Sequence, residues 1–226
     1  MKRSLPHLRA GLLLIVPAVL IAVLVGVFYL KKPSLDFDPF IGRALDPPVA
    51  MPPFSLIDHR GGEFANSNLL GHWTLAFFGF TYCPDVCPTA LNEMAAVYRQ
   101  MGGDPGEGGA PEFIFFTVDP FRDTPEELGK YVGHFNKGFV GVTGSPETIS
   151  RLVAGLGLYY AYTDPDDDHV LDGVLQRPAM EYYGVIHSSR LLFISPQAEL
   201  VAVMSPPFTF GNVMEFLTAL RKHYGD

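Results

Sequence analysis

Basic residues are scarce in this sequence, in which 16 lysines and arginines stand against 24 aspartates and glutamates. Residues 1–32 contain five of the 16 and no acidic residue, so the rest of the chain is more acidic than the formal net charge of −8 suggests. An acidic surface repels phosphates, so nucleic acid is not an expected partner. The chain also lacks an internal repeat and the length for a second full domain, which predicts one compact domain.

Long apolar runs are equally rare, and the one present lies near the N-terminus. Residues 10–30 carry no charged side chain, and a helix of about 20 residues spans the hydrocarbon core of a bilayer. Three basic residues precede the run and no small-residue cleavage pattern follows it, so we expect an uncleaved anchor with the N-terminus inside. The expected organisation is a membrane anchor at 1–32, a proline-rich extended tether at 33–52 and a folded domain at 53–226.

From residue 54 onward, strand patterns alternate with helix patterns. The expected strands lie at 54–57, 73–80, 112–118, 139–143, 159–162, 191–194 and 200–203, and the expected helices at 88–101, from 125, at 146–155 and at 212–222. Thr124 and Ser145 each precede a proline, the arrangement of an N-cap hydroxyl followed by proline at the first helical position. This order predicts an α/β fold in which helices cover both faces of a central sheet, with an antiparallel hairpin near the C-terminus.

The two cysteines lie where a buried strand gives way to a helix. Segment 81–88 follows the strand at 73–80, at the carboxyl end where open α/β sheets bind their ligands. Pro84 and Pro88 disfavour the helical conformation in the residue before each, so both thiols are expected on a stiff loop with Cys87 near the N-cap of the next helix. The exposed N–H groups of a helix start favour the thiolate, the form that binds a metal or attacks a disulfide.

Cys83 and Cys87 are the only cysteines, and their separation permits either a disulfide or the joint capture of one ion. A disulfide across so short a loop adds little stability. Two thiolates are too few for a closed tetrahedral zinc site and point to Cu(I), with an imidazole added for Cu(II). His187 directly precedes a predicted strand and is a candidate for that imidazole, although a buried structural histidine is the competing interpretation. The other histidines are His7, His59, His72, His134, His169 and His223.

The segment TYCPDVCP at 81–88 resembles the cysteine motif of the Sco/SenC family of copper proteins. Two further segments are similar to that family and occur in the same order, VDPFRDTP at 118–125 and the pair His187-Ser188 before a strand. The resemblance extends from residue 53 to the last helix, and the anchor and tether are similar too. It implies a thioredoxin-like fold, with a central mixed sheet flanked by helices.

The resemblance also implies a ligand set and a role. Copper, as Cu(I) or Cu(II), is then held by Cys83, Cys87 and His187 in a metallochaperone, not an enzyme, that helps to assemble the binuclear copper centre of cytochrome c oxidase. The implied partners are the copper-accepting oxidase subunit and another periplasmic copper chaperone. The chain would cross the inner membrane once, with its domain in the periplasm. Family members often carry an acidic residue before the histidine; this chain has Ile186, so we expect a weaker hold on Cu(II).

A thiol–disulfide oxidoreductase is the main alternative, with Cys83 and Cys87 as its redox pair. Three residues between the cysteines, and a His-Ser pair where thioredoxins usually present a proline, fit that function less well. A peroxidase is a weaker third interpretation, because nothing marks either cysteine as peroxidatic. Asp119 and Asp123 also match the family; we interpret them as structural, with Asp123 supporting the turn into the next helix. The acidic residues at 164–168 are expected in a solvated loop.

Overall fold

The computed structural model describes residues 19–21, 23, 42–103, 109–164, 166, 169–171 and 173–224. The chain divides into two units, Met1–Leu35 and Asp36–Asp226, and the fold described below is that of the second. Within the described residues, no helix combines the length and apolar character that a membrane crossing needs. The predicted anchor at 1–32 lies outside the described residues except for 19–21 and 23, so it stays a prediction.

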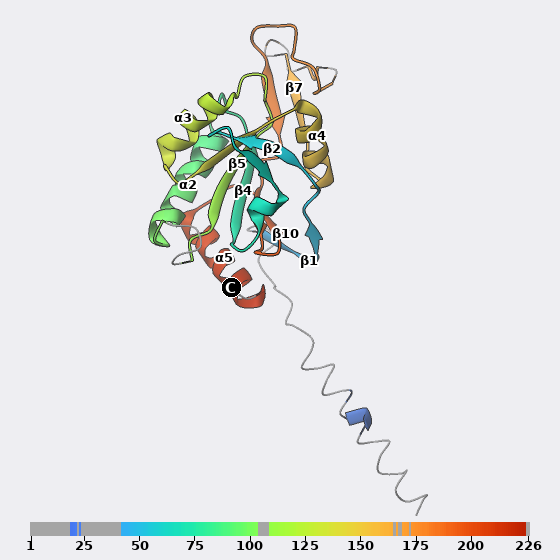
Figure 1. The fold of residues 1–226 in the computed structure, drawn as a ribbon, viewed down its shortest axis with the longest axis vertical. Helices are drawn as coiled ribbons and strands as arrows, with labels where there is room; N and C mark the ends of the chain where they lie inside the picture. The colour runs from blue at the N-terminus through green and yellow to red at the C-terminus, as the bar shows by residue number, and fades with distance from the viewer. Residues whose placement is uncertain are drawn as a thin grey trace, which may run out of the picture. The chain divides into compact units, whose positions relative to one another are not determined.

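An eight-stranded mixed sheet forms the centre of the domain, with strand order β1-β10-β9-β4-β5-β6-β2-β3 (Figure 1). Its strands are β1 (Gly42–Ala50), β2 (Ser55–Asp58), β3 (Glu63–Ala65), β4 (Thr74–Gly79), β5 (Glu112–Thr117), β6 (Val140–Thr143), β9 (Leu191–Ile194) and β10 (Glu199–Met204). β4, β5 and β6 pair in parallel, and the other neighbours pair antiparallel. The predicted mixed sheet and its C-terminal hairpin, formed by β9 and β10, are therefore confirmed.

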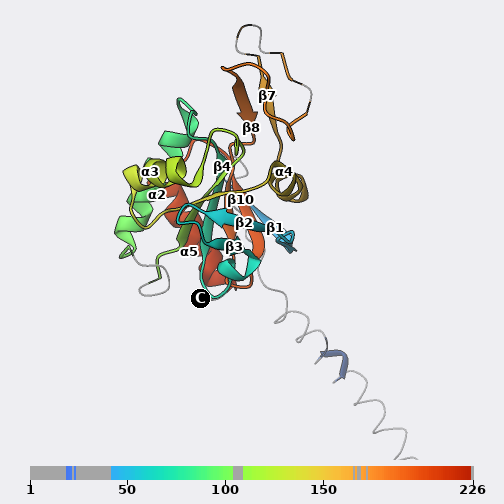
Figure 2. The same cartoon turned by 45° about the horizontal axis from the view of Figure 1, so that its top comes forward.

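Helices cover the sheet on both sides. They are η1 (Asn66–Leu69), α2 (Val86–Gln100), α3 (Pro125–Phe135), α4 (Pro146–Gly155) and α5 (Phe210–Tyr224). In both views α2, α3 and α5 gather on one side and α4 lies on the other (Figures 1 and 2). The predicted caps of α3 and α4 are confirmed, because the Thr124 side chain accepts from the Glu127 N–H and Ser145 accepts from the Thr148 N–H.

Every residue of β4 is buried, which fits a central strand covered on both faces. The ring of Phe78 stacks on that of Phe116 from β5, with centroids 4.9 Å apart. Phe77 likewise stacks on Phe115 at 6.4 Å. This aromatic core fixes the carboxyl end of β4, from which the cysteine segment emerges.

The tether predicted over 33–52 is wrong over 42–50, because these residues form β1 and pair with β10 at the edge of the sheet. Pro47 and Pro48 had favoured an extended tether. They lie where the β1–β10 register shifts between Ala44 and Val49. At an irregularity on an edge strand, a residue without an N–H removes no ladder hydrogen bond, so the prolines are tolerated.

Two further boundaries differ from the prediction. α2 begins at Val86 and not at Pro88, so Cys87 lies inside the first helical turn. Pro88 is tolerated there because the first four N–H groups of a helix have no partner within it. In addition, the loop expected before β9 contains a strand, β8 (Gly184–His187), which pairs antiparallel with β7 (Tyr160–Thr163). We call this pair the β7–β8 ribbon; Figure 2 shows it projecting beyond the central sheet.

Candidate metal centre

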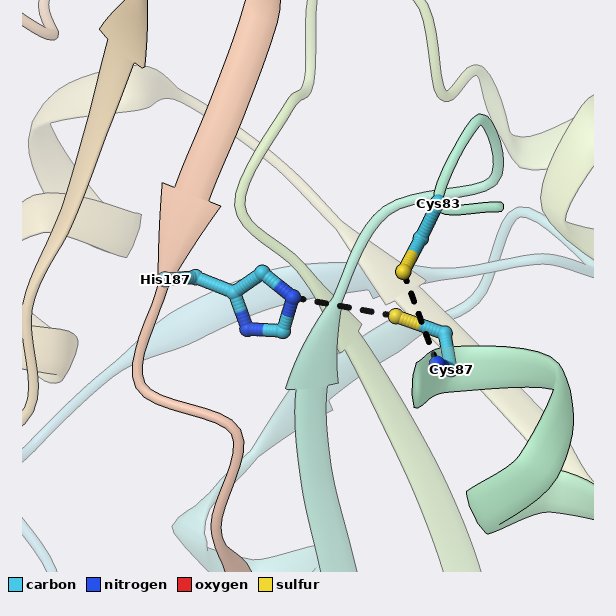
Figure 3. A group of neighbouring side chains, drawn as sticks. All are labelled: Cys83, Cys87 and His187. Atoms are coloured by element: carbon cyan, nitrogen blue, oxygen red, sulfur yellow. Dashed lines mark hydrogen bonds between the residues drawn. The ribbon is translucent and has the colours of Figure 1, made fainter. Parts of the chain in front are cut away.

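Both cysteines lie at the carboxyl end of β4. Cys83 belongs to the cysteine loop, which we define as residues 80–85 between β4 and α2, and Cys87 lies in the first turn of α2 (Figure 3). Cys83 is 8% exposed and Cys87 is fully buried. The two thiols are free, and the backbone N–H of Cys87 donates to Sγ of Cys83 across 3.4 Å. The strand and the helix start thus hold both sulfur atoms together.

His187 completes the cluster from the far end of β8. Its Nε2 atom lies 3.7 Å from Sγ of Cys87, and the ring points toward the two sulfurs (Figure 3). The rings of Phe77 and Phe80 meet the imidazole edge-on, with centroids 6.2 and 5.7 Å away. One ligand atom from each of Cys83, Cys87 and His187 falls within 4.8 Å of the others. The structure therefore brings together the three residues that the sequence nominated.

The two thiols differ widely in pKa because they share a hydrogen bond. A hydrogen bond from Cys87 lowers the pKa of Cys83 to about 4, against the opposing effect of burial, and His187 and backbone N–H groups contribute further. The same hydrogen bond to Cys83, together with burial, raises the pKa of Cys87. At neutral pH the pair is therefore one thiolate, at Cys83, beside one thiol, at Cys87.

The imidazole is positioned by packing and by its Nε2 contact with Cys87, and within the described residues its second nitrogen has no hydrogen bond to orient it. In the described part of the chain, Nδ1 of His187 is buried without a hydrogen-bond partner. Ile186, where the resemblance led us to look for a carboxylate, is 44% exposed, and its side chain offers no polar atom. Ligating histidines usually donate their second N–H to such a partner. Here the aromatic rings of Phe77 and Phe80 pack against the imidazole of His187 and restrict its orientation.

Asp123 fixes the cysteine loop. Its carboxylate accepts from the Thr81 N–H at 3.0 Å, from the Thr81 hydroxyl at 2.5 Å and from the Thr117 hydroxyl at 2.6 Å. Burial raises the pKa of Asp123 to about 6, although these hydrogen bonds favour the carboxylate. We predicted that Asp123 supports the turn into α3. Its side chain instead ties Thr81, two residues before Cys83, to the end of β5.

Two residues near the centre, Arg122 and Tyr183, were not singled out by the sequence, and both contact Asp119. The carboxylate of Asp119, expected to be structural, is buried and accepts from the Tyr183 hydroxyl at 2.8 Å and from Arg122. Arg122 also donates to the Tyr183 carbonyl at 3.0 Å. Arg122 stands in the matched segment 118–125, but no local pattern indicates that it contacts a residue 61 positions away.

Other histidines and the acidic residues considered in the sequence analysis lie outside the metal centre. Nδ1 of His59 accepts from the Gly141 N–H at 3.1 Å, and His72 pairs with Glu112 at 3.1 Å. Of the acidic loop at 164–168, only Asp164 and Asp166 are described, and the Asp166 N–H bonds the Asp164 side chain. Within the described residues, no second group of metal-binding side chains accompanies the cysteine–histidine cluster.

A mixed sheet flanked by helices, with two cysteines at the end of a central strand, defines a thioredoxin-like domain with a third donor from a histidine. The profile described as SCO1/SenC matches residues 43–221. The chain therefore belongs to the SCO1/SenC family.

Several members of this family are similar over much of the chain. The crystal structure of Arabidopsis thaliana ScoI with copper bound has 31% sequence identity and a TM-score of 0.65, covering 77% of this chain and 99% of that one. The mitochondrial SCO1 homolog 1 of Arabidopsis thaliana is 38% identical, over 60% of this chain and 42% of its own length. The human mitochondrial SCO1 homolog is 33% identical, over 67% and 51%. This chain thus spans about half the length of these two mitochondrial relatives.

Proposed function

We propose that the protein is a copper metallochaperone, which holds the ion between Cys83, Cys87 and His187 and passes it to a recipient protein. The observation that carries this proposal is the convergence of two sulfurs and one imidazole nitrogen within 4.8 Å. Thiolates select soft ions such as Cu(I), and an imidazole extends the set toward Cu(II). The donor set therefore fits copper in both oxidation states.

Relatives support both the ion and the task. Sco proteins of Arabidopsis thaliana and yeast were solved with copper bound. The solved BsSco is described as a member of the Sco family of cytochrome c oxidase assembly proteins. We therefore propose the copper-accepting subunit of cytochrome c oxidase, with its binuclear copper centre, as the recipient, and another periplasmic copper chaperone as a second partner.

Release requires that the ligands can be shared with the recipient. Cys83 lies near the surface, between the exposed Tyr82 and the exposed Asp85, whereas Cys87 is fully buried. An incoming thiolate or imidazole can thus reach the copper from the side of Cys83 while Cys87 still holds it. Three protein donors leave room for such a transient shared complex, and no chemical turnover is needed.

The uncharged run at 10–30 supports a location at the membrane. We propose that it anchors the chain in the inner membrane with the N-terminus inside, so that the copper domain faces the periplasm. Fusion of a reporter active only in the periplasm to the C-terminus tests this topology. A reporter that stays inactive would contradict it.

The copper proposal is tested by titrating the full chain, reduced, with Cu(I). We expect one ion per chain, and we expect Cys83→Ala and Cys87→Ala each to abolish binding, because one thiolate and one imidazole remain. Retention of full affinity by either variant would refute the proposal. In cells that lack the protein, added copper should restore oxidase activity if delivery is the task.

A thiol–disulfide reductase is the second candidate, favoured by the low pKa of Cys83 beside a protonated Cys87. The Cys83 thiolate would attack a disulfide of the partner, forming a mixed disulfide and releasing one partner thiolate. Cys87, after losing its proton, would then displace the second partner thiolate, leaving this chain oxidised and the partner reduced. A disulfide switch identified in BsSco supports this candidate. Restoration of oxidase activity by an added thiol reductant, and not by copper, would favour it.

A further inference from the structure

His187 depends on the β7–β8 ribbon and not on the central sheet. Among the described strands, β7 and β8 pair only with each other, and Tyr160 stands opposite His187 in their register. The backbone ladder of the central sheet holds the chain from Leu191 onward, four residues after His187, and so does not by itself set the distance from His187 to the cysteines. That distance depends on the contacts that fix the ribbon to the rest of the domain.

Tyr162 of β7 contributes one such contact, because its hydroxyl donates to the Val118 carbonyl at 3.2 Å. Several others meet at Tyr183, the residue directly before β8, which is 5% exposed. Its hydroxyl donates to Oδ1 of Asp119 at 2.8 Å, and its carbonyl accepts from Nη1 of Arg122 at 3.0 Å. Cζ of Arg122 also lies 3.7 Å from the centroid of the Tyr183 ring. Tyr183 is thus held by its backbone, its ring face and its hydroxyl, all through the segment 119–122.

The same guanidinium faces the cysteine loop. Cζ of Arg122 lies 5.0 Å from the ring centroid of Tyr82, the neighbour of Cys83, and 5.9 Å from that of Phe80. The Arg122 side chain is only 15% exposed, and its Nε donates to the fully buried Asp119. A planar guanidinium can stack on rings and donate several hydrogen bonds at once. Arg122 therefore links the ribbon to the cysteine loop.

Two adjacent residues, Arg122 and Asp123, hold the two halves of the centre by different hydrogen bonds. Asp123 ties down the cysteine loop through Thr81, whereas Arg122 ties down the ribbon through Tyr183. Loss of Arg122 should therefore free the histidine, whereas the hydrogen bonds from Thr81 to Asp123 continue to hold the cysteine loop.

We infer that Arg122 is a positioning residue for the metal centre, which holds the strand bearing His187 against the cysteine loop. The inference rests on the proposed copper site for its metal readout. His187 follows Tyr183 by four residues, about 13 Å along an extended strand. A shift at Tyr183 is thus carried to the imidazole by the paired strand.

The test compares Arg122→Met, Arg122→Lys and the control Arg60→Met in the full chain; the Arg60 side chain is 66% exposed. In the copper-free protein, the nuclear Overhauser effect between the His187 ring and the Cys87 β-protons should weaken in Arg122→Met and persist in Arg60→Met. Affinity for Cu(II) should fall about 10-fold in Arg122→Met. Affinity for Cu(I), which the thiolates dominate, should change less than about twofold. Arg122→Lys keeps the positive charge but lacks the planar guanidinium. Its losses of Cu(II) affinity and of the Overhauser effect should lie between those of the unmodified chain and Arg122→Met.

A purely structural role predicts a different result. It would lower the urea midpoint and reduce Cu(I) and Cu(II) affinity by the same factor, which would overturn the inference. An unchanged Overhauser effect in Arg122→Met would overturn it as well. If that variant fails to fold, Arg122→Lys carries the same test. If the unmodified chain binds no copper, the proposed function fails, whereas the copper-free comparison still decides the role of Arg122.

Discussion

Gly79, the last residue of β4, lies directly against Cys87: a β-carbon placed on Gly79 would come within 2.7 Å of the Cys87 sulfur. It would also lie 2.9 Å from the ring of Phe115. Both neighbours are fully buried and cannot move into solvent. The absence of a side chain at this position therefore allows the buried thiol to approach the strand.

Gly79→Ala should destabilise the domain by about 1–3 kcal/mol, because overpacking forces the neighbouring side chains out of place. Cu(I) affinity should fall with it, since Cys87 is displaced. The matched control is Gly133→Ala in α3, where an added β-carbon meets nothing within 4 Å and should stabilise the helix by about 0.5–1 kcal/mol. For both variants, urea unfolding measures the stability and competition with a Cu(I) chelator measures the affinity. A Gly79→Ala chain as stable as the unmodified one would contradict the expectation.

Copper loading should release about one proton at pH 7, because metal binding requires both thiolates. Cys83, with its pKa lowered to about 4, has already lost its proton at that pH, whereas Cys87, with its raised pKa, has not. Calorimetric titration with Cu(I) in two buffers of different ionisation enthalpy counts the protons. Release of two protons would show that Cys83 is a thiol in the copper-free protein.

His187→Ala should weaken Cu(II) binding about 10- to 100-fold and Cu(I) binding much less, because imidazole suits the harder ion. His72→Ala is the control, since His72 pairs with Glu112 and takes no part in the cluster. Visible absorption of the Cu(II) form is the measurement. An unaltered spectrum in His187→Ala would place the third donor elsewhere.

Asp123 should make stability depend on pH in an unusual direction for a carboxylate. Burial raises its pKa in the folded state from 3.8 to about 6, so the folded chain binds a proton that the unfolded chain has released. The contribution of this group to the free energy of unfolding is thus greatest below pH 3.8 and declines as pH rises to about 6. The decline amounts to about 3 kcal/mol.

Asp123→Asn should remove that decline, because an amide does not titrate. Urea unfolding of both chains at several values between pH 4 and pH 7 gives the difference in stability, from which groups common to both chains cancel. A difference that stays constant over this range would mean that Asp123 ionises at its ordinary pKa.

Much of the fold could be predicted because it depends on neighbours in the sequence. The caps at Thr124 and Ser145 and the buried strand β4 follow from local chemistry. β1 could not be predicted, since its prolines resemble a tether until β10 is known to lie beside it. β8 was missed for a related reason, because its partner β7 lies far back in the chain.

In the candidate site, too, local features could be predicted from the sequence and long-range contacts could not. The cysteine pair is local and was recognised from four-residue spacing and flanking prolines. His187 lies 100 positions from Cys87 and was nominated among seven histidines by family resemblance. Arg122 contacts Tyr183, 61 positions away, and Asp123 contacts Thr81, 42 positions away. No pattern in the sequence predicts contacts over such separations.

The pairing of β1 with β10 also limits the length of chain between the domain and the proposed anchor. With Gly42 already in the sheet, only residues 33–41 separate the domain from the proposed anchor. Fully extended, they reach about 30 Å, where the whole of 33–52 would have reached about 70 Å. If residues 10–30 anchor the chain as proposed, so short a connection would keep the copper site close to the bilayer, at high effective concentration for acceptors embedded in the same membrane. Acceptor proteins that diffuse freely in the periplasm would then have to approach the membrane to receive copper.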